Sequence, residues 1–127
     1  MINSLMISLV KMIKKLIPST IITYNIVGGF LMLKNISVKN IDPNNMKIID
    51  IRNREKYNTS HIPGSINIEI LDLNNNPEKY LNFNEIYYIY CQYGRTSIKT
   101  CINLSKKGYN VINIMGGYES WLINESN

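Results

Sequence analysis

The chain has 127 residues, of which 45% are hydrophobic and 18% charged, and this composition suits one globular domain with its own core. Fourteen Lys and Arg against nine Asp and Glu give a net charge of +5, but three of the lysines precede residue 32. The body is therefore only mildly basic and shows no recognisable array of stacking aromatic residues. This argues against a nucleic-acid partner and leaves a small anion as a fitting ligand.

The cysteine and histidine content excludes two further classes. Two cysteines, Cys91 and Cys101, are too few for the disulfide framework of a small secreted domain. They form no Cys-x-x-Cys pair, and a single histidine argues against a transition-metal site built from protein ligands. These features predict free thiols in a reducing, cytoplasmic compartment, with no metal and no cofactor.

Residues 1–31 differ from the rest, so we treat them as an N-terminal extension of a domain that spans residues 32–127. Residues 16–33 are largely apolar and near the lower length limit for a membrane span. Pro18 and several polar or glycine residues make this segment a poor spanning helix. Residues 5–17 place apolar side chains near helical spacing, which permits a weak membrane-surface helix.

The genetic code offers another interpretation of the same segment. Val27-Gly28-Gly29 can be encoded so that it contains a bacterial ribosome-binding sequence, at a normal spacing before Met32. Met32 is then the true start of a bacterial protein. A mis-assigned start, a membrane or interfacial anchor and an extra helix all stay open for residues 1–31.

From residue 36 onward, short β-branched runs alternate with helical stretches. Strands are predicted at residues 36–38, 47–51, 65–68, 86–91 and 111–115. Helices are predicted at residues 54–58, 96–107 and 118–123, and turns at residues 40–45, 61–64, 74–77 and 116–117. Strands that alternate with helices predict an α/β fold with a mainly parallel sheet covered on both faces.

The loop after the 86–91 strand is the strongest candidate site. In an α/β sheet, ligands bind where strands end and helices begin. Gly94 allows the loop to curl with its amides inward, and the helix expected from Thr96 adds unpaired N–H groups and a positive dipole end. A thiol placed there, at Cys91, is expected to ionise readily, and Arg95 on the rim attracts an anion. Cys101 is expected instead to pack in the core.

Three motifs in order resemble single-domain rhodaneses over nearly all of residues 36–123. Ile48-Ile-Asp-Ile-Arg52 resembles a strand that ends in Asp-Val-Arg, and His61-Ile-Pro-Gly-Ser-Ile-Asn67 resembles a His-Ile-Pro-Gly segment. Cys91-Gln-Tyr-Gly-Arg-Thr-Ser97, followed by Gly116-Gly-Tyr-x-x-Trp121, resembles the active loop and the closing segment. The resemblance implies a rhodanese-like fold with a small, mainly parallel five-stranded sheet flanked by helices.

The resemblance also implies a sulfurtransferase in which Cys91 carries sulfur as a persulfide. Thiosulfate or another small anionic sulfur donor would bind the rest of the loop: Gln92, Tyr93, Gly94, Arg95, Thr96 and Ser97. Many relatives carry Arg where this chain has Thr96, which puts the choice of donor in doubt.

Three other motif residues are expected to support the site rather than to react. Asp50 and Arg52 would form an ion pair near the active edge. His61 would anchor its loop through hydrogen bonds, because sulfur transfer from a ready thiolate needs no general base.

Two rival functions stay open. A phosphatase or arsenate reductase wants Arg six residues after the cysteine, where this chain has Ser97, and its loop looks one residue too short. A non-catalytic binding module would have lost the cysteine, as inactive relatives typically do. Within the enzyme interpretation, a carrier that exchanges sulfur with a partner protein stands beside a free thiosulfate sulfurtransferase. A membrane partner would require residues 1–31 to be an anchor.

Overall fold

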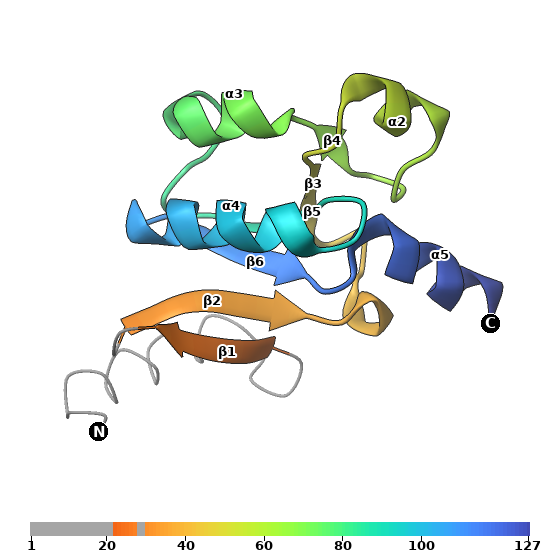
Figure 1. Ribbon diagram of the computed structural model, residues 1–127, viewed down its shortest axis with the longest axis horizontal. Helices are drawn as coiled ribbons and strands as arrows, with labels where there is room; N and C mark the ends of the chain where they lie inside the picture. Colours follow the sequence, from red (N-terminus) through yellow and green to blue (C-terminus); the bar gives the residue numbers. More distant parts are fainter. Residues whose placement is uncertain (1–21, 28–29) are drawn as a thin grey trace.

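The computed structural model describes residues 22–27 and 30–127 (Figure 1). The membrane-surface helix considered for residues 5–17 lies outside this range, as do Gly28 and Gly29. In the described ranges, no helix combines the length and the apolar character needed to cross a bilayer.

One six-stranded sheet, in the order β1-β2-β6-β5-β3-β4, forms the centre of the fold. Strand β1 is antiparallel to β2, and every other neighbouring pair is parallel. The mainly parallel sheet predicted from the sequence is therefore confirmed. The strands are β1 (Ile22–Val27), β2 (Phe30–Ile36), β3 (Lys47–Asp50), β4 (Ile66–Asn67), β5 (Ile86–Tyr90) and β6 (Asn110–Ile114).

The sixth strand comes from the segment that the sequence analysis set apart. Ile22, Thr23 and Tyr24 are β-branched or aromatic and belong to β1, which pairs with β2. Strand β2 begins earlier than the predicted strand at residues 36–38, and Val38–Asn40 forms the 3-10 turn η1 instead. The sequence pattern missed β1 because its apolar run also fits a membrane segment.

Four α-helices and two 3-10 turns complete the described part of the chain. The predicted helices correspond to α2 (Arg54–Thr59), α4 (Arg95–Lys106) and α5 (Gly117–Ser126). Helix α3 (Ile70–Asn75) was not predicted, because its asparagines resemble a turn. Pro77 opens the second 3-10 turn, η2 (Pro77–Lys79), at a position that suits its fixed φ angle.

Helices cover both faces of the sheet, as predicted, and the core consists of two apolar clusters. In β5, Tyr87 and Ile89 point into the cluster that includes Cys101 and Leu104 of α4. Tyr88 and Tyr90, which alternate with them along the strand, point to the opposite face and into the cluster that includes Tyr118 of α5. Figure 1 shows α4 running along the sheet and α5 close to the ends of the strands.

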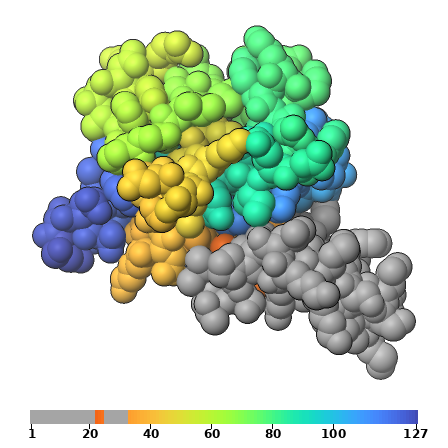
Figure 2. Space-filling model, turned by 180° about the vertical axis from the view of Figure 1, so that it is seen from behind, coloured from red at the N-terminus to blue at the C-terminus, as the bar shows by residue number. Residues whose placement is uncertain are grey.

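The opposite side of the molecule shows how the connections lie. In Figure 2 the segment between β2 and β3, orange to yellow, lies between α5 in dark blue and the teal segment that leads into β5. Strand β5 ends at Tyr90, and the loop that follows begins with Cys91, which packs in the apolar cluster between α4 and the sheet.

Candidate active site

Cys91 lies directly after β5, and three residues separate it from α4, which begins at Arg95. Gly94 caps this helix with a φ of 87°, a left-handed conformation that glycine adopts without a steric penalty. A Cβ atom there would lie 2.8 Å from the backbone nitrogen of Gly116. The helix thus begins one residue earlier than predicted, because Gly94 turns the chain straight into it.

Two backbone N–H groups and one hydroxyl group surround the Cys91 sulfur. The backbone N–H of Gly94 donates to Sγ at 3.1 Å, and that of Ser97 at 3.4 Å. The Ser97 hydroxyl oxygen lies 3.3 Å from the same sulfur. Only 5% of Cys91 is exposed. The loop and the first turn of α4 therefore form a cradle of N–H groups for one sulfur atom.

These contacts favour the ionised form of the thiol. Burial raises the pKa of Cys91, since a charge is poorly solvated inside the protein. The side-chain hydrogen bonds of Ser97 and Thr96 and the amides of Ser97 and Gly94 lower the pKa by more, so it falls below its ordinary value. Thr96 thus contributes to the lowered pKa of Cys91.

Two buried asparagines, which the sequence analysis missed, lie behind Ser97. The Ser97 hydroxyl donates to Oδ1 of Asn113 at 2.7 Å, and Nδ2 of Asn113 donates to Oδ1 of Asn35 at 3.0 Å. Asn113 is 1% exposed and Asn35 6%. A signal was available for Asn113, because it interrupts the apolar run of the strand predicted at residues 111–115, whereas Asn35 lies just before the strand predicted at residues 36–38.

The paired glycines Gly116 and Gly117 hold the loop from the other side. The N–H groups of Tyr118 and Glu119, in the first turn of α5, donate to the carbonyls of Cys91 and Gln92 at 2.9 and 3.0 Å. A Cβ atom on Gly117 would lie 2.3 Å from the Cys91 carbonyl oxygen. This close approach explains why the closing motif needs glycine there.

Asp50 and Arg52 form the expected ion pair, with Nη2 of Arg52 2.7 Å from Oδ2 of Asp50. The guanidinium lies over the ring of Tyr118 at 4.3 Å and donates to Oε1 of Gln92 at 3.0 Å. Burial lowers the pKa of Arg52, but the hydrogen bond and charge of Asp50 raise it by more. The pair thus fixes one side of the loop through Gln92.

His61 contacts the backbone of helix α2, just before its own loop. Its Nδ1 lies 2.8 Å from the carbonyl oxygen of Tyr57, and the two rings stack with centroids 3.9 Å apart. Tyr90 anchors the same loop more deeply, because its hydroxyl accepts from the N–H of Ile62 at 3.0 Å. Within residues 22–27 and 30–127, no three His, Cys, Asp or Glu side chains gather to hold a metal ion.

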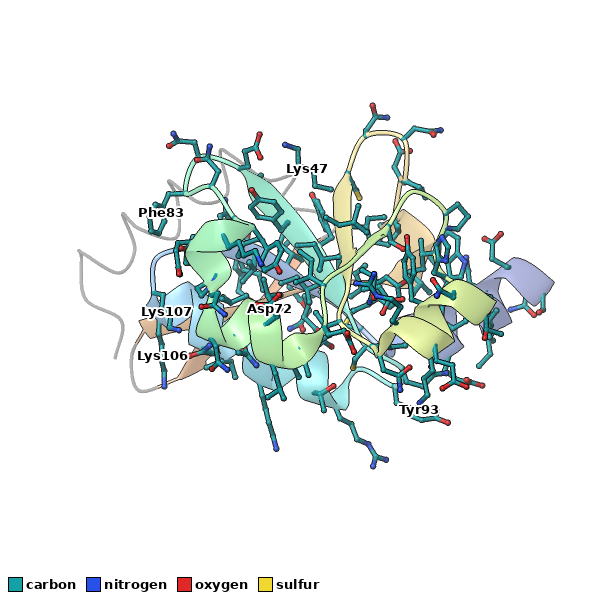
Figure 3. All side chains as sticks on the ribbon, turned by 90° about the horizontal axis from the view of Figure 1, so that it is seen from above. Lys47, Asp72, Phe83, Tyr93, Lys106 and Lys107 are labelled. Atoms are coloured by element: carbon teal, nitrogen blue, oxygen red, sulfur yellow. The ribbon has the colours of Figure 1, made fainter. Side chains whose placement is uncertain are left out.

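The rim of the cradle is open. Tyr93 is 63% exposed and projects from the edge of the molecule in Figure 3, and Arg95 and Thr96 are exposed beside it. Two cavities flank Tyr93. One of about 440 Å³ reaches down to Asn35 and Asn113. The other, of about 360 Å³, is lined by two cationic side chains and five further residues: Arg52, Lys56, Thr59, Ser60, Gln92, Tyr93 and Tyr118.

Cys101 packs in the core, as predicted. It is fully buried in the cluster between α4 and the sheet. Burial raises its pKa, and the positive charge of Lys34 lowers it by less. Lys34 is itself buried, and its ammonium donates to the side chain of Asn110.

The chain belongs to the family of rhodanese-like domains, whose model matches residues 35–124. It is 30% identical over 76 residues to YtwF of Bacillus subtilis, whose name describes a sulfurtransferase; the match covers 58% of this chain and 71% of that protein. YrkF of Bacillus subtilis, whose name describes a sulfur carrier protein, is 34% identical over 77 residues, with 60% and 41% covered. This chain spans less than half the length of YrkF.

Solved structures agree with this assignment. A rhodanese-related protein from Thermoplasma volcanium superposes with a TM-score of 0.65 at 26% identity, covering 71% of this chain and 91% of that one. The resemblance found in the sequence motifs is therefore confirmed, with six strands in place of the expected five. The relatives support a role in sulfur transfer.

Proposed function

We propose that this protein is a sulfurtransferase that moves sulfane sulfur through a persulfide on Cys91. The observation that carries the proposal is the set of contacts around Sγ: two backbone N–H groups and the Ser97 hydroxyl meet at one sulfur, at the junction of β5 and α4. Such a cradle stabilises a thiolate before reaction and the terminal anion of a persulfide after it.

The first step is a displacement at sulfur. The Cys91 thiolate attacks the outer sulfur of thiosulfate, the sulfur–sulfur bond of the donor breaks, and sulfite leaves with the bonding electron pair. A persulfide donor would react in the same way and release a thiolate. The cationic side chains of Arg52 and Lys56 line the neighbouring cavity, and Arg95 is exposed on the rim, which supports an anionic donor.

In the second step a nucleophilic acceptor attacks the outer sulfur of the persulfide. The Cys91 sulfur then leaves as a thiolate, so neither step needs a general base, a metal or a cofactor. His61, whose Nδ1 contacts the Tyr57 carbonyl, has no part in this scheme beyond holding its loop. The name of YrkF, which describes a sulfur carrier protein, supports a protein as one of the exchange partners.

Phosphoryl transfer suits this site less well. An arginine that clamps a tetrahedral oxyanion is missing six residues after Cys91, where the buried Ser97 hydroxyl donates to Asn113. The cradle is built around one sulfur atom, and the role of phosphatase or arsenate reductase lacks the arginine that such chemistry uses to clamp the oxyanion.

Intact-mass measurement after incubation with thiosulfate tests the proposal. We expect a gain of one sulfur atom, mapped to Cys91 and removed by cyanide or a thiol. Cys91→Ser should take up none, while Cys101→Ser, which changes the same atom in the core, should still take up sulfur. If the wild type gains no sulfur from thiosulfate or from a low-molecular-weight persulfide, the proposal fails and a binding module is favoured.

A further inference from the structure

The hydrogen bonds behind Cys91 form one continuous chain. From the sulfur, it passes through the Ser97 hydroxyl to Asn113 on β6 and to Asn35 on β2. Asn35 and Asn113 are register partners in the parallel pair β2–β6. Both lie among apolar neighbours, where an amide is stable only if its polar groups are paired.

The Ser97 hydroxyl carries one proton, and two acceptors compete for it. In the structure this proton goes to Oδ1 of Asn113, so the Ser97 oxygen presents a lone pair to Cys91. That arrangement suits a protonated thiol, whose S–H donates to the oxygen. A thiolate needs the opposite, a hydroxyl that donates to the sulfur.

We propose that Asn113, held by Asn35, is a positioning residue that sets the direction of the Ser97 hydroxyl and switches it as Cys91 changes charge. When the thiol releases its proton to solvent, the Ser97 hydroxyl rotates and donates to the sulfur. The Asn113 amide turns over, so that its Nδ2 donates to Ser97 and its Oδ1 faces Asn35. The Asn35 amide turns in the same way and donates to that Oδ1. Only the S–H bond breaks, and every other proton stays on its own atom.

This inference rests on the proposed function for its purpose, since it concerns the charge of the sulfur that would carry the persulfide. Other charged or titratable groups reach the surroundings of the loop or of the polar chain from neighbouring elements: Cys101 and Arg95 on α4, Lys34 on β2, Arg52 after β3 and Glu119 on α5. None of them takes part in the hydrogen bonds of Ser97, Asn113 and Asn35.

The switch predicts opposite effects for two substitutions of similar size. Asn113→Asp accepts hydrogen bonds but cannot donate them, so it keeps the Ser97 proton away from the sulfur. We expect the pKa of Cys91 to rise by at least about one unit, so the pH profile of its alkylation should move upward by the same amount. Asn113→Leu removes the competing acceptor and leaves the hydroxyl free to donate to the sulfur, so the pKa should stay level or fall.

The experiment measures alkylation of Cys91 by iodoacetamide against pH, with peptide mapping to separate it from Cys101. Asn110→Asp places the same negative charge on the same strand β6 as a control, and we expect it to leave the Cys91 profile unchanged. Asn35→Asp is a second route, because a carboxylate there holds Nδ2 of Asn113 and locks the amide in the orientation seen here. It should raise the pKa of Cys91 even if Asn113→Asp does not fold.

Shifts of the same sign in Asn113→Asp and Asn113→Leu, or an unchanged profile in both aspartate variants at positions 35 and 113, would overturn the inference. The outcome is separable from the fate of the proposed function. Alkylation reports the thiol itself, so the profiles can shift as expected even if Cys91 never accepts sulfur from a donor.

Discussion

Cys91 and Cys101 are the same residue type in the same apolar cluster, and the protein gives them opposite properties. Both are nearly or fully buried between α4 and the sheet. Burial alone raises a thiol pKa, and at Cys101 it does so with only a smaller opposing effect from Lys34. At Cys91 the hydrogen bonds from the first turn of α4 outweigh burial, and the pKa falls. The pKa of each thiol thus depends on the hydrogen-bond donors around its sulfur more than on its exposure.

The largest expected effect is a difference in reaction rate between the two thiols. In the native protein at pH 7, iodoacetamide should modify Cys91 at least about a hundredfold faster than Cys101, because only Cys91 has its thiolate stabilised by donors. Peptide mapping at successive times measures both rates. In denaturant the two rates should converge. Comparable rates in the native state would contradict the expected difference between the two thiols.

Gly117→Ala should lower the reactivity of Cys91 and leave that of Cys101 unchanged. The new Cβ atom would meet the Cys91 carbonyl oxygen, and Gly117 has a φ of +60°. We expect the free energy of unfolding to fall by about 2–4 kcal/mol and Cys91 alkylation to slow, as measured by urea denaturation and by mapping.

Gly108→Ala is the matched control for this substitution. Gly108 also has a positive φ, of +96°, but its added Cβ would make only ordinary contact with the ring of Phe83. We expect a loss of about 1 kcal/mol from backbone strain and no change in Cys91 reactivity. Equal loss of reactivity in both variants would mean that general destabilisation disturbs the loop, and not the clash with its carbonyl.

Lys34→Met should sharpen the comparison, because Lys34 is the cation that lowers the pKa of Cys101. Burial lowers the pKa of Lys34 itself to about 8. Between pH 8 and its ordinary pKa, the unfolded chain holds a proton that the folded chain has lost, so stability rises with pH through this window. Below pH 8 the folded protein confines a poorly solvated charge.

The methionine variant should therefore be more stable than the wild type at pH 7, by about 1–3 kcal/mol. The advantage should fade as pH rises from 8 to 10.5. Urea denaturation across this range measures it, with Lys39→Met, at an exposed position, as the control. A wild type that is the more stable protein at pH 7 would contradict the expectation.

Arg95→Ala should give the smallest effect. Arg95 is exposed on the rim, where it attracts an anion without contacting the sulfur. Sulfur uptake from thiosulfate should slow by about two- to fivefold at low salt, and the difference should shrink as salt screens the charge. Lys99→Ala, one turn further along α4 and also exposed, should change the rate less. A salt-independent loss would point to a structural role for Arg95.

The sequence predicted those parts of the site that local chain geometry determines. A β-rich strand followed by Cys91, a glycine and a helical pattern indicates a cradle at a helix start, and Cys101 falls on the inward face of that helix. The ion pair of Asp50 and Arg52 was expected for the motif that resembles a strand ending in Asp-Val-Arg.

Features that depend on pairing between distant segments could not be predicted in this way. Strand β1 is recognisable only through its partner β2, and Asn35 meets Asn113 only because β2 lies beside β6. The close approach of Gly117 to the Cys91 carbonyl likewise brings together two segments that are distant in the sequence. Side-chain periodicity carries no information about such meetings.

The hydrogen bonds that backbone N–H groups of α5 donate to the loop also join the two into one cooperative unit. Because the Tyr118 and Glu119 N–H groups donate to the carbonyls of Cys91 and Gln92, the loop cannot open without breaking these two hydrogen bonds at the start of the helix. Hydrogen exchange at these two amides therefore reports the opening of the loop. A group added to the Cys91 sulfur that tightens the loop would be detected at the start of α5 as slower exchange.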